Sequence, residues 1–384
     1  MKNALIITRH YLDQNLGGPN CSKAFVRALA DIYGQCTLIY PEHNEKSTDL
    51  SFIGGDGLHA VPCRDTRTRK DKLMAVYRGV LHRFSAAVKE ALAHGGFDVV
   101  FIDHSFVASS GVIEAAKASG AKIVTLHHNV ERNYLKDNKP NLLYRLPYVK
   151  FALEAERKAV ACSDLNLTLT RSDADHFKAA CPEKAAMVEA MGMFEYTDRK
   201  PMTGYPCGRK DYFAISGALS ARQTETAILL FLSKYFQLLD DMNLGATLWI
   251  AGRNPSRKLI KEVRNHINVN LVPSPPDLLG VISRSKYYIC PLHTGSGIKL
   301  RIMDALRIGM PVVAHKVSAH GYEDMLDKGV MFAYDDPESF EEAVGKMMDC
   351  TKSRSEVSDI YYASFSYDKG RERLEEILSR RGLV

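Results

Sequence analysis

Short apolar runs alternate with amphipathic stretches along the first half of the chain, and each run has the length of a buried strand. After the first run, Phe25, Leu29 and Ile32 recur at helical spacing, which predicts an amphipathic helix. The strands predicted in this half are residues 4–8, 36–40, 98–102 and 121–126. Strands that alternate with helices favour a parallel sheet with helices on both faces.

The same alternation restarts after a polar stretch in the middle of the chain. Residues 196–210 contain Pro201, Gly204 and Pro206 among polar side chains, which predicts an interdomain linker. The strands predicted beyond it are residues 212–216, 247–251, 269–272, 287–290 and 311–314. We therefore expect two α/β domains, at residues 1–195 and 211–365, each built on a doubly wound parallel sheet. Because ligands bind beyond the carboxyl ends of such strands, two sheets facing each other would place a cleft between the domains.

Composition narrows the class of protein. Of the 384 residues, 46% are hydrophobic and 25% are charged, which excludes disorder and collagen. The longest apolar runs fall short of the ~18–20 residues of a membrane span, and Arg9 comes too early for a secretory signal. The eight cysteines form no C-x-x-C pair, so neither a disulfide scaffold nor a structural zinc site is supported. We expect reduced thiols in a cytoplasmic protein.

The net charge of +6 suits an anionic small molecule or a membrane surface, and it is too small to indicate nucleic acid. The densest basic segment is residues 64–84, which carry Arg64, Arg67, Arg69, Lys70, Lys72, Arg78 and Arg83. Within it, Leu73, Tyr77, Val80, Leu81 and Phe84 recur at helical spacing and predict one amphipathic helix. Either this helix packs on the first domain with a solvated basic side, or it contacts anionic lipid, worth about 1 kcal/mol per basic residue.

A glycine-rich turn follows the predicted strand 287–290. Gly295 and Gly297 allow close approach of a ligand to the backbone, and a helix predicted from about Ile298 would direct amides toward a phosphate. Lys299 and Arg301 add positive charge, and Asp304 is expected about two turns into the helix, where it could bind sugar hydroxyls. The alternative is an ordinary strand–turn–helix corner with solvated basic residues. The turn fails the P-loop pattern, and no G-x-G-x-x-G follows the first strand.

These residues resemble a known family. The stretch Gly295-Ser296-Gly297-Ile298-Lys299-Leu300, followed by Asp304-Ala305-Leu306, Gly309 and residues 311–314, is similar to the donor-site signature of family 4 glycosyltransferases. Weaker similarities occur in the same order along the chain, at Gly17-Gly18, His128-Asn129-Val130-Glu131, Ser163-Asp164, Thr170-Arg171-Ser172, Gly217 and Gly252. The resemblance implies the glycosyltransferase B fold of two Rossmann-like domains, with a C-terminal helix at 366–384 that crosses back to the first domain.

The resemblance also implies roles in donor binding. Asp304 would bind the ribose, and Ser296 stands where relatives carry a glutamate that touches the transferred sugar. The residues that would line the sugar and diphosphate are Gly295, Gly297, Ile298 and Lys299. Gly17, Gly18 and Gly217 are also expected to bind the donor. Pro273 and Ser274 would edge the nucleobase.

The chain departs from many relatives at two cations that clamp the diphosphate. Ala218 and Gln223 occupy these positions. Arg222, Arg253 or Lys299 could substitute for the two missing cations. Positive charge at this place matters because it stabilises the negative charge of the leaving diphosphate.

Two histidines follow the predicted strand 121–126. By the resemblance, His128 would contact the donor sugar and phosphate and act in catalysis together with Ser296 and Lys299, with His127 as the fallback. Without the resemblance, a histidine at a strand end is more often a structural hydrogen-bond partner.

Other polar residues follow strands of the first domain. Asp103 and His104 could contact acceptor hydroxyls, although a structural role is the simpler alternative. His10 and Asp13 could form the base of an inverting enzyme, although solvation in a flexible loop is the favoured explanation.

The resemblance implies transfer with retention of the anomeric configuration. No carboxylate nucleophile stands out, so a double displacement is not supported. The resemblance implies same-face substitution, in which the leaving phosphate helps to deprotonate the acceptor hydroxyl and the protein supplies positioning. No Asp-x-Asp motif follows a predicted strand in the pattern of metal-dependent sugar transferases, so we expect neither a metal nor another cofactor.

The predicted function is therefore a cytoplasmic retaining glycosyltransferase. It would transfer a sugar from a nucleotide sugar to a saccharide or lipid-linked saccharide in polysaccharide or glycoconjugate biosynthesis, and it could lie at the inner membrane face. Two alternatives stay open: a sugar-nucleotide epimerase of the same fold, and a catalytically silent subunit that binds nucleotide sugar.

Overall fold

The chain folds into two compact units in the computed structural model, which describes residues 2–54, 57–65, 67–137, 142–199 and 209–384. Unit 1 comprises residues 1–198 and 365–384, and unit 2 comprises residues 199–364. Most of the predicted linker, including Pro201, Gly204 and Pro206, lies outside the described residues.

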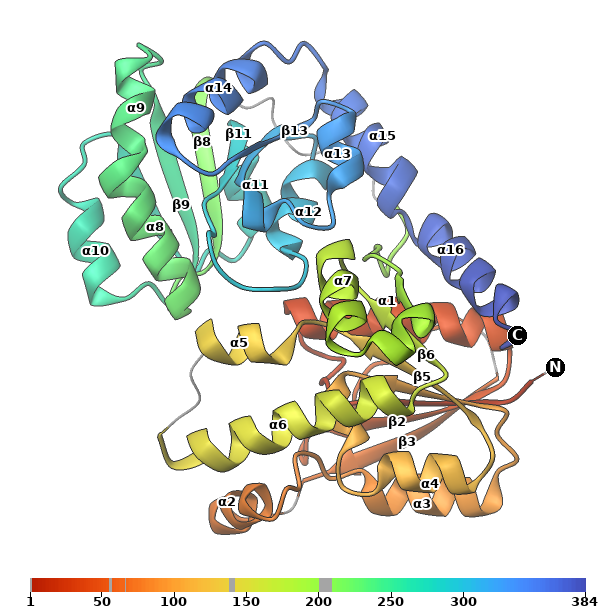
Figure 1. The fold of residues 1–384 in the computed structure, drawn as a ribbon. Helices are drawn as coiled ribbons and strands as arrows, with labels where there is room; N and C mark the ends of the chain where they lie inside the picture. The colour runs from red at the N-terminus through yellow and green to blue at the C-terminus, as the bar shows by residue number, and fades with distance from the viewer. Residues whose placement is uncertain (1, 55–56, 66, 138–141, 200–208) are drawn as a thin grey trace. The chain divides into compact units, whose positions relative to one another are not determined.

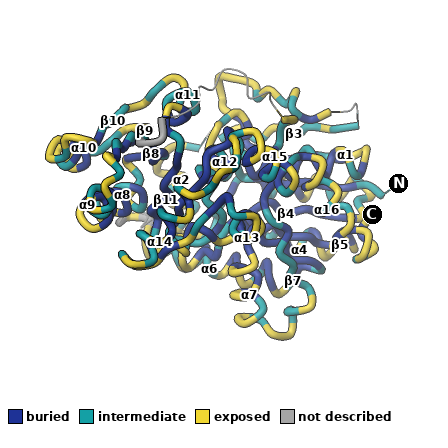
Figure 2. The backbone as a smooth tube through the Cα atoms, turned by 90° about the horizontal axis from the view of Figure 1, so that it is seen from above, coloured by how far each residue is buried: buried dark blue, intermediate teal, exposed yellow. Residues whose placement is uncertain are grey.

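Unit 1 is built on a seven-stranded parallel sheet in the order β3-β2-β1-β4-β5-β6-β7 (Figure 1). Its strands are β1 (Ala4–Thr8), β2 (Cys36–Glu42), β3 (Leu58–Arg64), β4 (Val99–Asp103), β5 (Lys122–His127), β6 (Leu165–Thr168) and β7 (Val188–Ala190). Every residue of β1 and β4 is buried, as expected for strands covered by helices on both faces. In Figure 2 the tube at β4 is dark blue.

The helices of unit 1 follow its strands. They are α1 (Gly17–Tyr33), α2 (Arg69–Tyr77), α3 (Ser85–His94), α4 (Val112–Ala118), α5 (Glu131–Asp137), α6 (Leu142–Cys162), α7 (Arg171–Ala180) and α16 (Tyr367–Arg380). The last helix, α16, packs beside α1 although the two are far apart in sequence (Figure 1). The Tyr33 hydroxyl on α1 donates a hydrogen bond of 2.8 Å to the carbonyl oxygen of Leu383, just beyond α16.

Unit 2 has a six-stranded parallel sheet in the order β10-β9-β8-β11-β12-β13. Its strands are β8 (Arg209–Ala218), β9 (Thr247–Arg253), β10 (Val269–Pro273), β11 (Ser285–Cys290), β12 (Val312–His315) and β13 (Met331–Tyr334). Its helices are α8 (Arg222–Lys234), α9 (Phe236–Asp241), α10 (Arg257–Val263), α11 (Leu278–Ile282), α12 (Leu300–Arg307), α13 (Glu323–Asp327), α14 (Pro337–Met348) and α15 (Arg354–Phe365). The prediction of two parallel-sheet α/β domains is confirmed.

The single amphipathic helix predicted over residues 64–84 is wrong. Arg64 ends β3, and among the described residues of this segment the only helix is α2, which ends at Tyr77 and has no buried residue. Gly79 has a φ of +76°, which lies in the left-handed region and does not continue a helix. Val80 and Leu81 therefore lie in a loop, and Phe84 is the residue that precedes α3.

No helix among the described residues is long and apolar enough to cross a membrane.

Candidate functional site

Polar side chains from three strand ends meet at the carboxyl edge of the unit 1 sheet. His10 follows β1, Asp103 ends β4, and His128 follows β5. Each offers one ligand atom, and these atoms all lie within 4.8 Å of one another. The structure thus brings together two residues predicted for different roles, His128 and Asp103, with His10 as a third.

Asp103 and His128 form a buried pair. His128 Nε2 lies 2.6 Å from Asp103 Oδ1, and the Thr8 hydroxyl donates to Asp103 Oδ2 at 2.6 Å. Burial by itself disfavours the charged form of His128, but Cys21 and Asp103 outweigh it and raise the pKa of His128 well above its usual value. Burial likewise opposes ionisation of Asp103, yet His128 dominates and lowers the pKa of Asp103 to about 2. The pair is therefore imidazolium and carboxylate at neutral pH.

His10 stays neutral beside this pair. Burial, followed by the charge of His128, lowers the pKa of His10 to about 3. Its Nδ1 lies 2.8 Å from the Ser22 hydroxyl, and its ring lies against Gly18, where an added Cβ would come within 2.6 Å of Nε2. The absence of a side chain at Gly18 thus allows the His10 ring to pack against the start of α1. Asp13, paired with His10 in the sequence hypothesis, lies instead 3.6 Å from His43.

The two consecutive histidines at the end of β5 have different surroundings. His127 Nε2 lies 2.9 Å from Asn166 Oδ1, and the His127 ring packs against Phe177 at 4.5 Å between centroids. Burial lowers the pKa of His127 to about 4. His127 is thus a neutral core residue, whereas His128 lies with Asp103.

His104 and Glu131 extend the cluster. His104 has a φ of +84°, an uncommon value for a residue other than glycine, and its Nε2 lies 3.3 Å from Glu131 Oε1. Glu131 is 1% exposed and its backbone N–H donates to Glu156 Oε2 at 2.6 Å. Burial and then Glu156 raise the pKa of Glu131 to about 8. Glu131 is therefore mostly protonated at neutral pH, a property that the sequence motif alone does not indicate.

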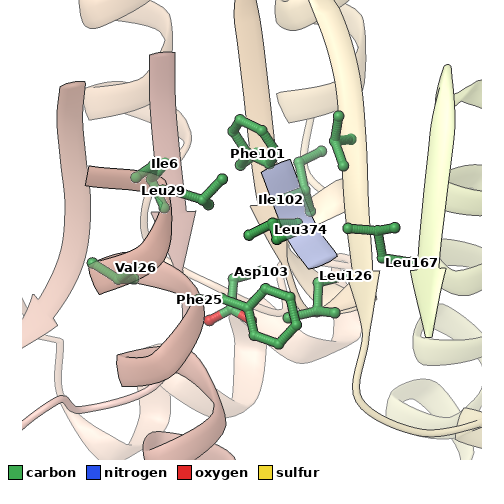
Figure 3. A pocket seen from close by; sticks show the side chains of 11 residues that line it. Ile6, Phe25, Val26, Leu29, Phe101, Ile102, Asp103, Leu126, Leu167 and Leu374 are labelled. Atoms are coloured by element: carbon green, nitrogen blue, oxygen red, sulfur yellow. The ribbon is translucent and has the colours of Figure 1, made fainter. Parts of the chain in front are cut away.

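An internal pocket lies beneath this edge. Figure 3 shows side chains of α1, of strands β1, β4, β5 and β6, and of Leu374 on α16 around it. The lining is apolar apart from Asp103. This pocket therefore belongs to the core of unit 1, and it lacks the polar groups that a nucleotide sugar needs.

The predicted donor residues of unit 2 meet at the carboxyl edge of its sheet. Gly217, Gly252 and Pro273 lie side by side in the register of β8, β9 and β10. An added Cβ at Gly252 would come within 1.8 Å of the Gly217 carbonyl oxygen, so glycine is required for the close approach. Arg253 and Ser274 follow directly and are exposed, as is Arg222 at the start of α8.

The glycine turn joins β11 to α12 at the same edge. The Lys299 ammonium donates to the carbonyl oxygens of Ser296 and Gly297 at 2.9 and 3.0 Å. The Gln223 amide donates to the carbonyl oxygen of Thr294 and lies close to Gly295. Lys299 and Gln223 thus fix the shape of the turn.

The helix after this turn starts later than predicted. It begins at Leu300, because Lys299, with φ −98° and ψ 87°, is the N-cap and is not helical, and Ile298 lies in the turn. Asp304 is therefore little more than one turn into α12, not two. Its carboxylate accepts a hydrogen bond of 2.6 Å from Arg307.

Arg301 is a residue whose position sequence reasoning missed. It was expected only to add charge near the turn, but its guanidinium donates to the Ser216 carbonyl oxygen at 2.9 Å and to the Thr224 hydroxyl at 3.1 Å. It thus reaches from α12 to the end of β8. The sequence signal for this contact is that Arg301 lies in the first turn of α12, which follows β11, the strand beside β8.

Four of the seven basic side chains of segment 64–84 form ion pairs with two carboxylates of unit 1. Asp65 pairs with Arg67, Lys72 and Arg83 at 2.9, 3.5 and 3.0 Å, and Glu42 pairs with Arg64 at 2.9 Å. Arg69, Lys70 and Arg78 are exposed. Because they lie outside these ion pairs, these three residues are the candidates for a contact with anionic lipid, although the side chains of Arg64 and Lys72 are also 51% and 45% exposed.

Comparison with known proteins links this architecture to glycosyltransferases. Residues 210–350 match the family described as glycosyl transferases group 1. Comparison with curated protein sequences gave no significant match. A solved glycosyltransferase from Rickettsia africae is 10% identical with a TM-score of 0.64, covering 99% of this chain and 98% of that chain.

Two further solved structures are similar over their whole length. HepE from Anabaena in complex with UDP and glucose is 12% identical with a TM-score of 0.63, covering 99% of this chain and 100% of its own. An alpha,alpha-trehalose 6-phosphate synthase from Burkholderia multivorans is 12% identical with a TM-score of 0.60, covering 99% and 97%. At such identity the similarity shows the fold. The chain therefore has the glycosyltransferase B fold, and its residues 210–350 match the model of the glycosyl transferases group 1 family.

Proposed function

We propose that the protein is a retaining glycosyltransferase that transfers a sugar from a nucleotide sugar to a hydroxyl of a saccharide or lipid-linked saccharide. The observation that carries the proposal is the Gly295–Gly297 turn at the carboxyl end of β11, within the residues that match the glycosyltransferase family. In a parallel sheet this edge is where ligands bind. We further propose that the protein acts in the cytoplasm, in polysaccharide or glycoconjugate biosynthesis, at the inner face of the membrane.

The donor would bind to unit 2. The amides of Gly295 and Gly297 suit a phosphate, and Asp304 would exchange its contact with Arg307 for the ribose hydroxyls. Pro273 and Ser274, at the end of β10, would edge the nucleobase.

His128 would act at the edge of unit 1. Because Asp103 holds it charged and oriented, His128 can stabilise negative charge on a sugar or phosphate group bound there. Asp103 itself has both oxygens engaged, by Thr8 and His128, so it would act through His128. The acceptor contact predicted for Asp103 and His104 stays a prediction.

Retention by same-face substitution fits the state of the buried carboxyl groups at this edge. A double displacement needs an ionised carboxylate free to attack the sugar. Asp103 is bound on both oxygens, and Glu131, with its pKa raised to about 8, is mostly protonated at neutral pH. Neither is therefore a suitable nucleophile.

We propose that no metal is required. His10, Asp103 and His128 have a spacing that a divalent cation could use, but a metal would need His128 to be neutral, whereas Asp103 favours its charged form. The test is sugar transfer measured with and without EDTA. Loss of activity that Mg²⁺, Mn²⁺ or Zn²⁺ restores would contradict this proposal.

A silent nucleotide-sugar-binding subunit is a second candidate, favoured by the uncharged Ala218 and Gln223 and by the contact of Gln223 with the glycine turn. Thermal shift with UDP-, GDP- and other nucleotide sugars tests donor binding, because a ligand selective for the folded state raises the melting temperature. Product analysis with the selected donor then separates the functions. Transfer to an acceptor supports the transferase, conversion of the donor alone indicates an epimerase, and binding without a product indicates the silent subunit.

A further inference from the structure

The guanidinium of Arg301 lies against the backbone at the end of β8. Its two hydrogen bonds to Ser216 and Thr224 hold it between β8 and α8. At Gly217, where φ is +146°, an added Cβ would come within 2.7 Å of the guanidinium atoms. Glycine at this position therefore leaves the space in which the Arg301 side chain lies.

The charge of Arg301 is not neutralised by the described residues. Its two bonded acceptors are a carbonyl and a hydroxyl, and no carboxylate of the described part of the chain lies within 4.0 Å of it. By contrast Arg307, on the same helix, pairs with Asp304 at 2.6 Å. A guanidinium carries five N–H donors, so donors remain for a further acceptor. A half-buried cation with neutral partners favours the binding of an anion.

Arg301 is also better fixed than the other cations at this edge. Arg222 and Arg253 are exposed, and the Lys299 ammonium already donates to two carbonyl oxygens of the glycine turn. A side chain held by two hydrogen bonds loses less conformational entropy when it binds a ligand. The planar guanidinium also matches two oxygens of a phosphate at once.

We propose that Arg301 binds the diphosphate of the donor and supplies the charge that Ala218 and Gln223 lack. This inference rests on the proposed function, since it assigns a residue to the diphosphate of the same donor site. Arg301 would stabilise the negative charge of the leaving diphosphate during transfer.

The test is calorimetric titration of the full chain with UDP, GDP and the corresponding monophosphates. Arg301→Gln is expected to weaken binding of the preferred diphosphate roughly 10- to 100-fold, the range for loss of charge-assisted hydrogen bonds. The monophosphate should lose less affinity, so the preference for diphosphate over monophosphate should shrink. Arg257→Gln, an exposed substitution on α10 of unit 2, is the matched control and should bind as the wild type does.

A second variant guards against a folding defect in Arg301→Gln. Thr224→Val keeps the shape of the side chain but removes one hydrogen bond to the guanidinium, and it is expected to weaken diphosphate binding several-fold. Wild-type affinity in both variants overturns the inference, as does a loss confined to Arg222→Gln or Arg253→Gln. If the wild-type chain binds neither UDP nor GDP, the proposed function fails and this inference with it.

Discussion

Glu131→Gln is the substitution with the most distinctive expected effect. The Glu131 side chain is buried at the start of α5, close to the Glu156 carboxylate and 3.3 Å from His104 Nε2. Glutamine keeps the size of the side chain and an oxygen for His104, but it cannot ionise. The substitution therefore removes one titration and leaves the packing of unit 1 in place.

The magnitude follows from the raised pKa. Burial and Glu156 move the pKa of Glu131 from 4.5 to about 8, so the unfolded chain loses this proton at lower pH than the folded chain does. The contribution of Glu131 to the stability of wild-type unit 1 should fall as pH rises from 4.5 to 8, by about 1.4 kcal/mol per pH unit, or about 5 kcal/mol over this range. Glu131→Gln lacks this loss. The variant should match the wild type near pH 4.5 and exceed its stability by up to about 5 kcal/mol at pH 8.

Hydrogen exchange of peptides from β4 and β5, compared at the same pH for both proteins between pH 5 and pH 8, measures this difference. The single tryptophan, Trp249, lies on β9 in unit 2, so its fluorescence provides an internal control in the same samples. Glu154→Gln, at a half-exposed glutamate of α6, is the matched substitution and should show no such trend. Parallel pH profiles for the wild type and Glu131→Gln would refute the reasoning.

Three further predictions concern ligands. Asp304→Asn should weaken nucleotide binding about tenfold through loss of a charged acceptor for the ribose, and unchanged affinity by calorimetry would remove Asp304 from the site. Lys299→Ala should lower the transfer rate at least about tenfold, because it removes a charge and two hydrogen bonds from the glycine turn; a wild-type rate in a donor-consumption assay would contradict this. Replacing Arg69, Lys70 and Arg78 by glutamine should reduce sedimentation with phosphatidylserine vesicles, because each substitution removes about 1 kcal/mol of binding free energy. Equal sedimentation of the variant and the wild type would indicate that these residues are only a solvated face.

The sequence predicted the parallel sheets well because apolar runs are a local signal. The predicted strand at residues 4–8 coincides with β1, and the strand predicted at 269–272 differs from β10 by one residue. The amphipathic helix over 64–84 failed because the spacing of apolar residues continued past Gly79, whose backbone conformation ends the helix. The turn after β11 was found, but the start of α12 was misplaced by the conformation of Lys299.

The candidate sites were harder to predict because their contacts join distant strands. Thr8, Asp103 and His128 come from three strand ends. The protonation states of Asp103 and His128 depend on each other, so neither can be predicted before the contact between them is known. Likewise, the contact of Arg301 with the end of β8 could be predicted only from the strand order, which places β8 beside β11. The sequence correctly indicated which edge of each sheet carries the candidate site. The contacts of each side chain could be identified only from the folded structure.

The central claim is tested most directly by a crystal structure of the protein with the nucleotide sugar that raises its melting temperature most. We expect the diphosphate within hydrogen-bond distance of the Gly295 and Gly297 amides, and the ribose at Asp304. A nucleotide bound elsewhere, with the Gln223 amide still filling the turn, would contradict the account.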